Sequence, residues 1–559
     1  MMNYRLEYND FFKEDRKPFF EYLDGIDKKL IFNTCAYLLT INSNNIEEII
    51  DSWFCFENFK IKEKLKKVIN EIIEEKKTPI NIINKINTLQ LFEYASEHLP
   101  EIESNISTKE FEIKLLKAFL SLNSEENGLE ILVEKSIKEV PINQKIEALI
   151  LTQTYHQFDI INSSSQKALI CQIVKAVLLF EFMESFDDKT QKILDNFCQY
   201  FGVKNWKEYF KWYLPIVKAI FKEDRIDGFI EFELISDSED ELQKHIDFFE
   251  KISIVDEFKL ADFDFLSLRE KPLFKHSDNK YKIIFPLFII EKVFQGLYFL
   301  MAEINKQGKY FKNFKSFYCD EFSEQNLVYK LLNLAFPDGF LKVSGEEAKT
   351  KGEPAEPDFY IRNKNNIFLF EAKDVLIRAD IKQSHDYNQL IAALTSKFYY
   401  STNKKGKRKN EAILQLLESI RKILGNKLTF DKTSDNDIKI YPILLTHYKQ
   451  YNTLGLNKIV NRWFKEELSN LENKGLDTSN VKDLIIIDID VFILFQKLFK
   501  TEQVSFESIL DQYISNSNIS DNILDTMLSF YHFMLQEEEY NNPDNFSQVY
   551  EKYAANIFK

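Results

Sequence analysis

The chain has 559 residues, and its 88 acidic and 73 basic side chains give a formal net charge of −15 at pH 7. This acidic balance argues against a protein that coats nucleic acid by bulk electrostatic attraction, although local basic patches can still bind phosphate. The length allows two or three domains with ample core, and the low counts of glycine (13) and proline (12) indicate a mostly helical protein outside any sheet-based domain.

The first 235 residues are predicted to form a helical domain, because segments such as 61–76 and 169–183 repeat apolar residues at helical spacing. The sequence has no repeat of fixed period to support a solenoid. A short strand is expected at 229–235, before the acidic run 236–241 and a capped helix. We expect this domain to sense a trigger, or to dock a protein partner or a second copy of the chain.

Residues 236–316 are predicted to connect this domain to the next, with a hairpin between 272 and 285. The most apolar run, 285–301, is interrupted by charged residues, which indicates a core helix rather than a membrane span. The sequence start has no signal-peptide pattern, and the five scattered cysteines form no CxxC pair and no zinc-type spacing with histidine. We therefore expect a protein of the reducing cytoplasm that is not embedded in a membrane.

A candidate site lies where Pro357-Asp358 is followed, thirteen residues after the aspartate, by Glu371-Ala372-Lys373. Asp358 begins a predicted strand, 358–361, and residues 367–373 form the returning strand of a predicted hairpin. Side chains alternate across a strand, so Glu371 and Lys373 share one face and point toward Asp358. Two carboxylates and the Ala372 carbonyl could hold Mg²⁺ or Mn²⁺, which would activate water for phosphodiester hydrolysis, while Lys373 would stabilise charge on the phosphate.

The tripeptide Glu-x-Lys alone is a weak signal, and its context distinguishes one copy from the others. Only Glu371 follows four apolar residues and has a partner aspartate across a plausible hairpin. A second segment of the chain has the same combination of motifs, since Pro337-Asp338 precedes another Glu-Ala-Lys tripeptide at Glu347. The alternative for Glu371 itself is a surface ion pair at the edge of a buried strand. The tripeptide begins at Glu74, Glu75, Glu112, Glu257, Glu347, Glu371 and Glu472.

With Pro357-Asp358 and Glu371-Ala372-Lys373 in place, residues 317–500 resemble the PD-(D/E)XK nuclease superfamily, which has the restriction-endonuclease-like fold. The resemblance implies an α/β core, in which a helix precedes the hairpin and a further strand and helices follow. It also implies Mg²⁺-dependent cleavage of nucleic acid, with DNA favoured over RNA.

Two further site residues follow from this resemblance. A helix with a capping pattern at Ser323 precedes the hairpin, and in the superfamily such a helix often brings an extra acidic residue to the metal, which is Glu324 here. A subset of the superfamily carries a glutamine on a helix after the lysine, and Gln415 is the matching residue. Ser419 stands where that subset has a tyrosine four residues later.

The remaining elements complete the expected order of the core. Helices are expected at 381–398 and 411–424, and strands at 439–445 and 484–488, each strand followed by a helix. Beyond residue 500 the pattern returns to helices, so residues 501–559 are predicted to form a helical C-terminal extension.

A basic segment lies between the two helices that follow the proposed active strand. A loop there could grip a nucleic-acid backbone, with an affinity that falls steeply as salt rises. In a lysine-rich protein the same loop could also be only solvated surface. Its basic residues are Lys404, Lys405, Lys407, Arg408 and Lys409.

The sequence therefore predicts a multidomain α+β or α/β protein with a large helical N-terminal region, a restriction-endonuclease-like core and a helical tail. The favoured function is a Mg²⁺- or Mn²⁺-dependent endonuclease controlled through its helical region, an architecture that resembles prokaryotic antiphage defence effectors. One alternative is a catalytically silent member of the fold that binds nucleic acid or protein. Another is a helical scaffold in which the Glu-x-Lys match is accidental.

Overall fold

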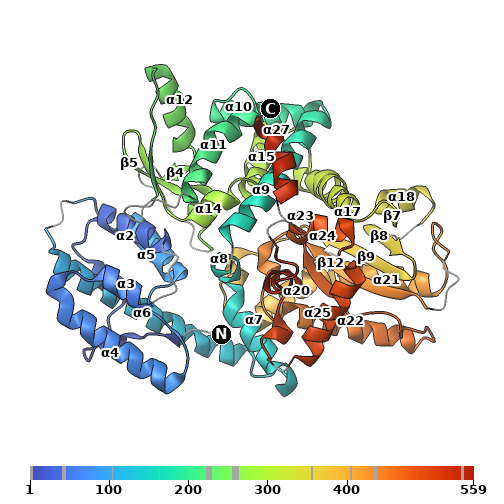
Figure 1. The fold of residues 1–559 in the computed structure, drawn as a ribbon, viewed down its shortest axis with the longest axis horizontal. Coiled ribbons are helices and arrows are strands. Elements are labelled where there is room, and N and C mark those ends of the chain that lie inside the picture. The colour runs from blue at the N-terminus through green and yellow to red at the C-terminus, as the bar shows by residue number, and fades with distance from the viewer. Residues whose placement is uncertain are drawn as a thin grey trace. The chain divides into compact units, whose positions relative to one another are not determined.

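The computed structural model shows a helix-rich chain of mixed α/β class with several small sheets (Figure 1). The chain forms two compact units, each built from two stretches: Met1–Leu132 with Cys198–Lys292, and Val133–Phe197 with Val293–Lys559. This division does not follow the boundaries expected at 235, 316 and 500. Among the described residues, no helix is long and apolar enough to cross a membrane. The structure describes residues 4–40, 46–102, 105–162, 164–221, 230–254, 264–353, 357–402, 406–432, 437–520, 522–542 and 547–558.

The first unit is mostly helical and confirms the expected helix at 61–76, which is α4. Its four-stranded sheet has the order β3-β6-β5-β4, and β5 and β6 form the predicted hairpin. The side chain of Ser238 caps α12, as the sequence predicted. Its main elements are β1 (Tyr4–Arg5), α1 (Tyr8–Phe11), α2 (Lys28–Thr40), α3 (Ile46–Trp53), α4 (Phe59–Lys76), β2 (Ile80–Asn81), α5 (Lys85–His98), α6 (Thr108–Ser136), α11 (Trp206–Ile220), β3 (Glu231–Glu233), α12 (Glu239–Glu250), β4 (Ser253–Ile254), α13 (Leu266–Glu270), β5 (Leu273–Ser277), β6 (Lys280–Ile283) and α14 (Pro286–Glu291).

The single core helix expected at 285–301 is wrong, because two helices occupy this run. α14 ends at Glu291, and α15 begins at Gln295 after Phe294, whose backbone is not helical. The break falls where the chain leaves the first unit, after Lys292, and enters the second. The apolar content of the run was read correctly, but a turn at 292–294 separates the two helices.

The second unit contains the remaining helices and the main sheet. The expected helix at 169–183 is confirmed as part of α9. The main elements are α7 (Lys145–Tyr155), α8 (Phe158–Ile161), α9 (Ser165–Ser185), α10 (Asp188–Phe201), α15 (Gln295–Gly308), α16 (Phe314–Phe317), the π-helix η4 (Tyr318–Val328), α17 (Tyr329–Ala335), β7 (Leu341–Ser344), α18 (Gly345–Thr350), β8 (Phe359–Asn363), β9 (Asn366–Lys373), α19 (Ala379–Lys382), α20 (Tyr387–Phe398), β10 (Tyr400–Thr402), β11 (Arg408–Asn410), α21 (Ala412–Leu424), β12 (Lys439–Thr446), α22 (Leu456–Glu472), β13 (Ile485–Asp488), α23 (Asp490–Leu494), α24 (Gln496–Thr501), α25 (Phe506–Ile519), α26 (Phe530–Gln536) and α27 (Ser547–Phe558).

A five-stranded sheet with the order β13-β12-β9-β8-β7 organises the second unit (Figure 1). β7, β8 and β9 are antiparallel neighbours, whereas β12 and β13 run parallel to β9. The four strands that the sequence predicted here are confirmed, and the edge strand β7 was not predicted. β8 and β9 join through a tight turn in which Asn363 pairs with Asn366 and Lys364 adopts the left-handed conformation (φ 53°).

The two faces of this sheet bury different side chains. On one face, Leu369 and Leu444 belong to a core cluster with residues of α20, α21 and α22. On the other face phenylalanine rings gather, with the ring centroids of Phe368 and Phe506 5.2 Å apart and those of Phe370 and Phe492 5.8 Å apart. Burying one such side chain fully contributes roughly 1.5–3 kcal/mol, so the alternation along β9 fixes which residues face each layer.

Three expected elements near the site differ from the prediction. The helix expected at 381–398 is divided into α19 and α20, because His385 adopts a left-handed conformation and Asp386 caps α20. Ser323 does not cap a helix; it lies within a continuous helical stretch formed by α16, η4 and α17. The basic segment was expected to be a loop, but strands β10 and β11 pair across it.

The phenylalanine face gives a test of the fold. Phe368→Ala is expected to lower the free energy of unfolding by about 3–5 kcal/mol, because its ring is fully buried and its removal leaves a cavity. Phe299 on α15 is 60% exposed, so Phe299→Ala is a matched control that should change stability by no more than about 0.5 kcal/mol. Urea unfolding measures both variants, and equal losses would contradict the assignment of the core.

Candidate active site

The β8–β9 hairpin places Asp358 next to Glu371. Phe359 pairs with Phe370 in the register of the two strands, so Asp358, one residue before β8, lies opposite Glu371. The Oδ2 atom of Asp358 accepts a hydrogen bond of 2.7 Å from the backbone nitrogen of Ala372. The aspartate is thereby held against the end of β9, beside the residue that the sequence paired with it.

Lys373 connects Glu371 to α21. Its Nζ atom donates to Glu371 Oε1 at 2.9 Å and to Gln415 Oε1 at 3.0 Å. Gln415 therefore reaches the site although Ser419 replaces the tyrosine, and the Ser419 hydroxyl donates within its own helix to the Gln415 carbonyl. Glu371 is 1% exposed and Lys373 is half-buried, so this is a buried contact rather than a surface ion pair.

Glu324 enters the site from the π-helix η4. π-Helical segments are rare and occur frequently at functional sites. The Glu324 carboxylate accepts a hydrogen bond from the hydroxyl of Tyr329. Burial and then the negative charge of Asp358 raise the pKa of Glu324 to about 7, which places its charge near that of Asp358.

Burial and neighbouring charges shift the pKa values of Glu371 and Lys373. Burial first, and then the charges of Asp358 and Glu324, raise the pKa of Glu371 to about 8 against the opposing effect of Lys373. For Lys373 burial acts to lower the pKa, but the carboxylates of Glu371 and Asp358 prevail and raise it above its ordinary value. Three carboxyl groups thus meet a single ammonium group, so ionisation of all three would leave an excess of negative charge, and the raised pKa values reflect that conflict.

The residues present suit a divalent cation. Glu371 Oε2 is buried and has no hydrogen-bond partner among the described residues, so one carboxyl oxygen remains available on the residue opposite Asp358. Mg²⁺ and Mn²⁺ bind oxygen ligands and commonly retain water, and Asp358, Glu371 and the Ala372 carbonyl supply such oxygens. Within the described ranges, no group of three or more His, Cys, Asp or Glu side chains has the geometry to hold a metal ion alone. A cation here would therefore need the carbonyl or water ligands as well.

The other Glu-x-Lys tripeptides lie in different settings. Glu347 forms a capping box with Ser344: the Ser344 nitrogen donates to Glu347 Oε2 at 2.9 Å, and the Glu347 nitrogen donates to Ser344 Oγ. Its tripeptide therefore serves the start of α18. Glu257 lies outside the described residues. The remaining copies lie on helices: Glu74 and Glu75 on α4, Glu112 on α6 and Glu472 at the end of α22.

Sequence reasoning missed a polar cluster directly after Lys373. Ser323 Oγ donates to Asp374 Oδ2 at 2.6 Å and lies 3.4 Å from His447 Nδ1. Burial lowers the pKa of His447, and the Asp374 charge opposes that change. Only the position of Asp374, next to Lys373, pointed to this cluster in the sequence, because Ser323 was assigned to a helix cap.

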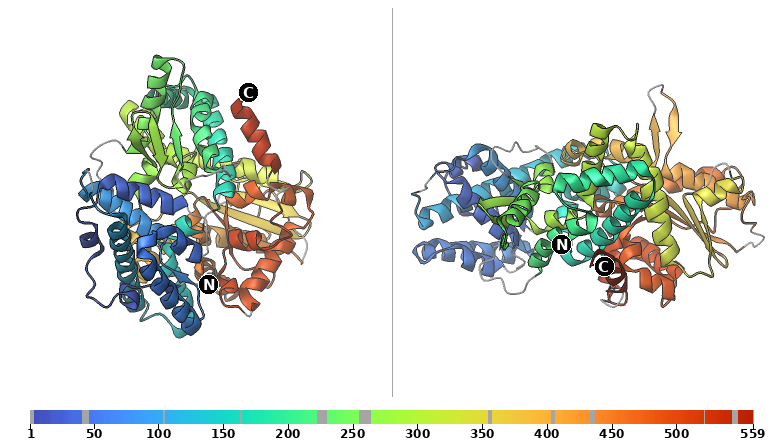
Figure 2. Two further views of the ribbon diagram at one scale, coloured as in Figure 1. Left: turned by 60° about the vertical axis from the view of Figure 1, so that its left-hand side comes forward. Right: turned by 90° about the horizontal axis from the view of Figure 1, so that it is seen from above.

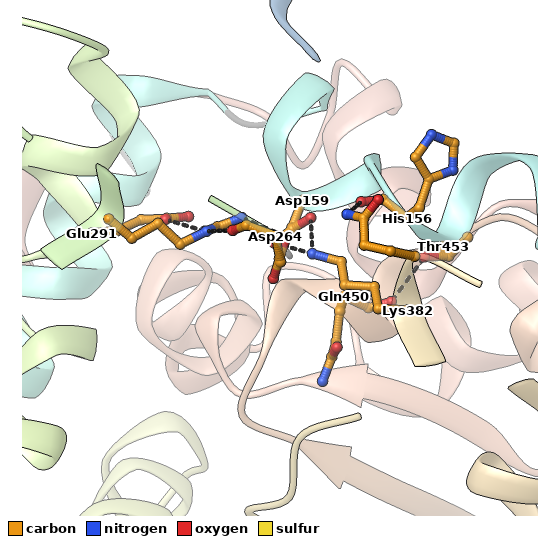
Figure 3. A network of polar contacts seen from close by, with 9 residues as sticks. His156, Asp159, Asp264, Glu291, Lys382, Gln450 and Thr453 are labelled. Carbon is orange, nitrogen blue, oxygen red and sulfur yellow. Dashed lines mark hydrogen bonds and ion pairs between the residues drawn. The ribbon is translucent and has the colours of Figure 1, made fainter. Parts of the chain in front are cut away.

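A further buried network of the second unit is structural. Lys382 Nζ, on α19, donates to both carboxylate oxygens of Asp159 at 2.9 and 3.0 Å, as the close view shows (Figure 3). The neighbouring Gln383 side chain donates to the carbonyl of His156. These groups satisfy one another and fix α19 against α8, which makes their individual removal costly without indicating chemistry.

The basic segment lies partly outside the described residues, which include neither Lys404 nor Lys405. Lys407, Arg408 and Lys409 are exposed, and the β10–β11 hairpin that carries two of them extends away from the flanking helices (Figure 2). Two weak ion pairs, Arg408–Glu467 at 3.8 Å and Lys409–Glu411 at 3.4 Å, lie along it. α21 begins directly after β11, and its Gln415 contacts Lys373, so the base of the hairpin adjoins the site.

Comparisons with protein-family models, with curated proteins and with solved structures gave no significant match for this chain.

The raised pKa of Glu371 predicts a pH-dependent stability in the absence of metal. Its folded pKa, about 8, lies above the ordinary 4.5, so its contribution to stability is complete below pH 4.5 and is lost as pH rises toward 8. The free energy of unfolding should fall by up to roughly 1.4 kcal/mol for each pH unit between these two values. Glu371→Gln should reduce the slope, whereas Glu347→Gln should retain it. Thermal unfolding in EDTA measures these slopes, and equal slopes for wild type and Glu371→Gln would refute the assignment.

Proposed function

We propose that this chain is a metal-dependent nuclease of the PD-(D/E)XK type, which hydrolyses phosphodiester bonds of nucleic acid, DNA in preference to RNA. The observation that carries the proposal is the buried constellation at the end of β9. There the strand register sets Asp358 opposite Glu371, and Lys373 joins Glu371 to Gln415. An accidental Glu-x-Lys match on a strand has no need of an aspartate in register or of a glutamine from a helix that contacts the lysine.

The order of elements around the site also supports the proposal. The helical stretch containing η4 and α17 precedes the hairpin, and α21 and the parallel strand β12 follow it. The resemblance found in the sequence implies this succession of helix, hairpin, helix and strand. The sheet that results places both acidic residues and Lys373 at one end of β9, where a phosphate could approach them.

Each residue can be given a role in hydrolysis. A divalent cation held by Asp358, Glu371 and the Ala372 carbonyl would polarise the phosphate and acidify a bound water. Lys373 keeps its positive charge because its pKa is raised, and so its Nζ can stabilise negative charge that develops on a phosphate oxygen. Gln415 holds the Lys373 ammonium in position. Glu324, with a pKa of about 7, can accept or release a proton near neutral pH.

The wider biological role follows from the same proposal. A nuclease active without restraint would damage its own cell, so we infer that the helical first unit serves control, by binding a trigger, a protein partner or a second copy of the chain. That combination of a nuclease with a large non-catalytic region fits a regulated effector of prokaryotic antiphage defence. The exposed Lys407, Arg408 and Lys409 are the proposed contacts to the nucleic-acid backbone, together with Lys404 and Lys405.

A cleavage assay tests the proposed chemistry. Plasmid, linear duplex, single-stranded DNA and RNA are each incubated with Mg²⁺, Mn²⁺ or EDTA. Wild type is expected to cut in the presence of metal only. Asp358→Asn and Glu371→Gln should abolish cutting with the fold intact, and Lys373→Met should lower the rate by about 10²–10³-fold through loss of charge stabilisation.

The matched control is Glu347→Gln. It changes the first residue of the other Glu-Ala-Lys tripeptide, which lies in α18, and it should leave the rate of cutting unchanged. Cutting by Glu371→Gln at the wild-type rate would exclude this site. Binding of nucleic acid without cutting, under every metal condition, would instead indicate the catalytically silent alternative.

A further inference from the structure

The β10–β11 hairpin carries an arginine stacked on an aromatic ring. Thr402 pairs with Arg408 and Tyr400 pairs with Asn410, so Tyr400 and Arg408 lie on the same face of the two-stranded ribbon. The guanidinium carbon of Arg408 lies 4.1 Å from the centroid of the Tyr400 ring. The Arg408 side chain is 51% exposed, and Tyr400 is partly exposed. The pair therefore presents planar surface to solvent rather than filling a core.

The stacked pair continues into a row of aromatic side chains that is anchored in the fold. The Arg408 guanidinium also lies 5.5 Å from the Tyr399 ring, and Tyr399 stacks on Trp463 of α22 at 6.0 Å and 15°. The hydroxyl of Tyr399 donates to Glu467, which also pairs with Arg408. Tyr399 and Trp463 pack against the core of the second unit, so they fix the position of the outer pair.

Such a surface suits unpaired bases better than a duplex. In a duplex the base faces are buried because the bases stack on one another, whereas an unpaired base can stack on an aromatic ring or a guanidinium plane. The edge of the Arg408 guanidinium can also bind a phosphate of the same strand, whereas Lys409, which pairs with Ser401, lies on the opposite face of the ribbon. Stiffening of a short ribbon alone would not require an exposed planar pair.

The hairpin is also placed to deliver a strand to the active site. Glu411 follows β11 directly, and its backbone nitrogen donates to the Tyr399 carbonyl. Gln415, which holds Lys373, lies one helical turn further along α21. A nucleic-acid strand bound by the ribbon would thus lie beside the residues proposed to cut it.

We propose that the Tyr400–Arg408 face of the β10–β11 hairpin binds unpaired bases, so that the substrate is a single strand or carries a single-stranded segment. This inference rests on the proposed nuclease function and adds the substrate class to it. The shared chemistry is a polyanionic strand with exposed base faces, which both single-stranded DNA and single-stranded RNA provide.

Binding measured in EDTA tests the inference separately from cleavage. Fluorescence anisotropy compares a labelled single-stranded DNA, the RNA of the same sequence and the matching DNA duplex. Wild type is expected to bind a single strand more tightly than the duplex. Tyr400→Leu should weaken single-strand binding by about tenfold, within the range expected for loss of one stacked base, and should leave duplex binding unchanged.

Two control variants distinguish loss of base stacking from a loss of folding as the cause of weaker binding by Tyr400→Leu. Tyr400→Phe keeps the ring and should keep the affinity, and Phe299→Leu removes an exposed ring on α15 and should change nothing. A single strand that contains 2-aminopurine should lose fluorescence on binding to wild type but much less on binding to Tyr400→Leu. The DNA and RNA arms show which strand the hairpin prefers.

Unchanged single-strand affinity in a stably folded Tyr400→Leu protein would overturn the inference, as would equal or tighter binding of the duplex by wild type. Neither result would bear on the proposed nuclease function. That function is contradicted if metal-dependent cutting is absent, or if it survives in Glu371→Gln. The two proposals can therefore fail independently.

Discussion

The central physical constraint in this protein is the crowding of carboxyl groups at the end of β9. Glu371 is buried, Asp358 lies opposite it, and Glu324 adds a third carboxyl group. The single ammonium group of Lys373 cannot balance all three in ionised form, so the pKa of Glu371 and that of Glu324 are raised and both groups hold protons to higher pH than usual. Burying unbalanced charge costs free energy, and a bound cation would let these groups ionise near neutral pH, which favours a metal site over a purely structural role.

The surrounding fold determines whether these groups can meet. A shift of one residue in the pairing of β8 with β9 would turn Glu371 and Lys373 to the phenylalanine face and bring Phe370 and Ala372 into their place. The buried rings on that face oppose such a shift. The π-helix then presents Glu324, and α21 presents Gln415, to a sheet end whose register is already fixed.

The sequence was sufficient for the regular and strongly patterned parts. β8 and β9 follow from a run of apolar residues bounded by turn residues, and Gln415 was found through the resemblance although its partner tyrosine is missing. Strands β7, β10 and β11 were missed because each has only three or four residues, and β10 and β11 are mostly polar, so none shows a clear alternation of apolar and polar residues in the sequence. The role of Ser323 was mistaken because a capping pattern is local, whereas its contact with Asp374 is set by tertiary packing.

The central claim is that Asp358 and Glu371 form a site for a divalent cation, and a calorimetric titration of the metal-free protein with Mn²⁺ tests it most directly. The account predicts saturable binding to wild type near neutral pH, weakened by more than about tenfold in Glu371→Gln and Asp358→Asn and unchanged in Glu347→Gln. Binding of equal strength in wild type and Glu371→Gln, or no binding to the folded wild type, would contradict it.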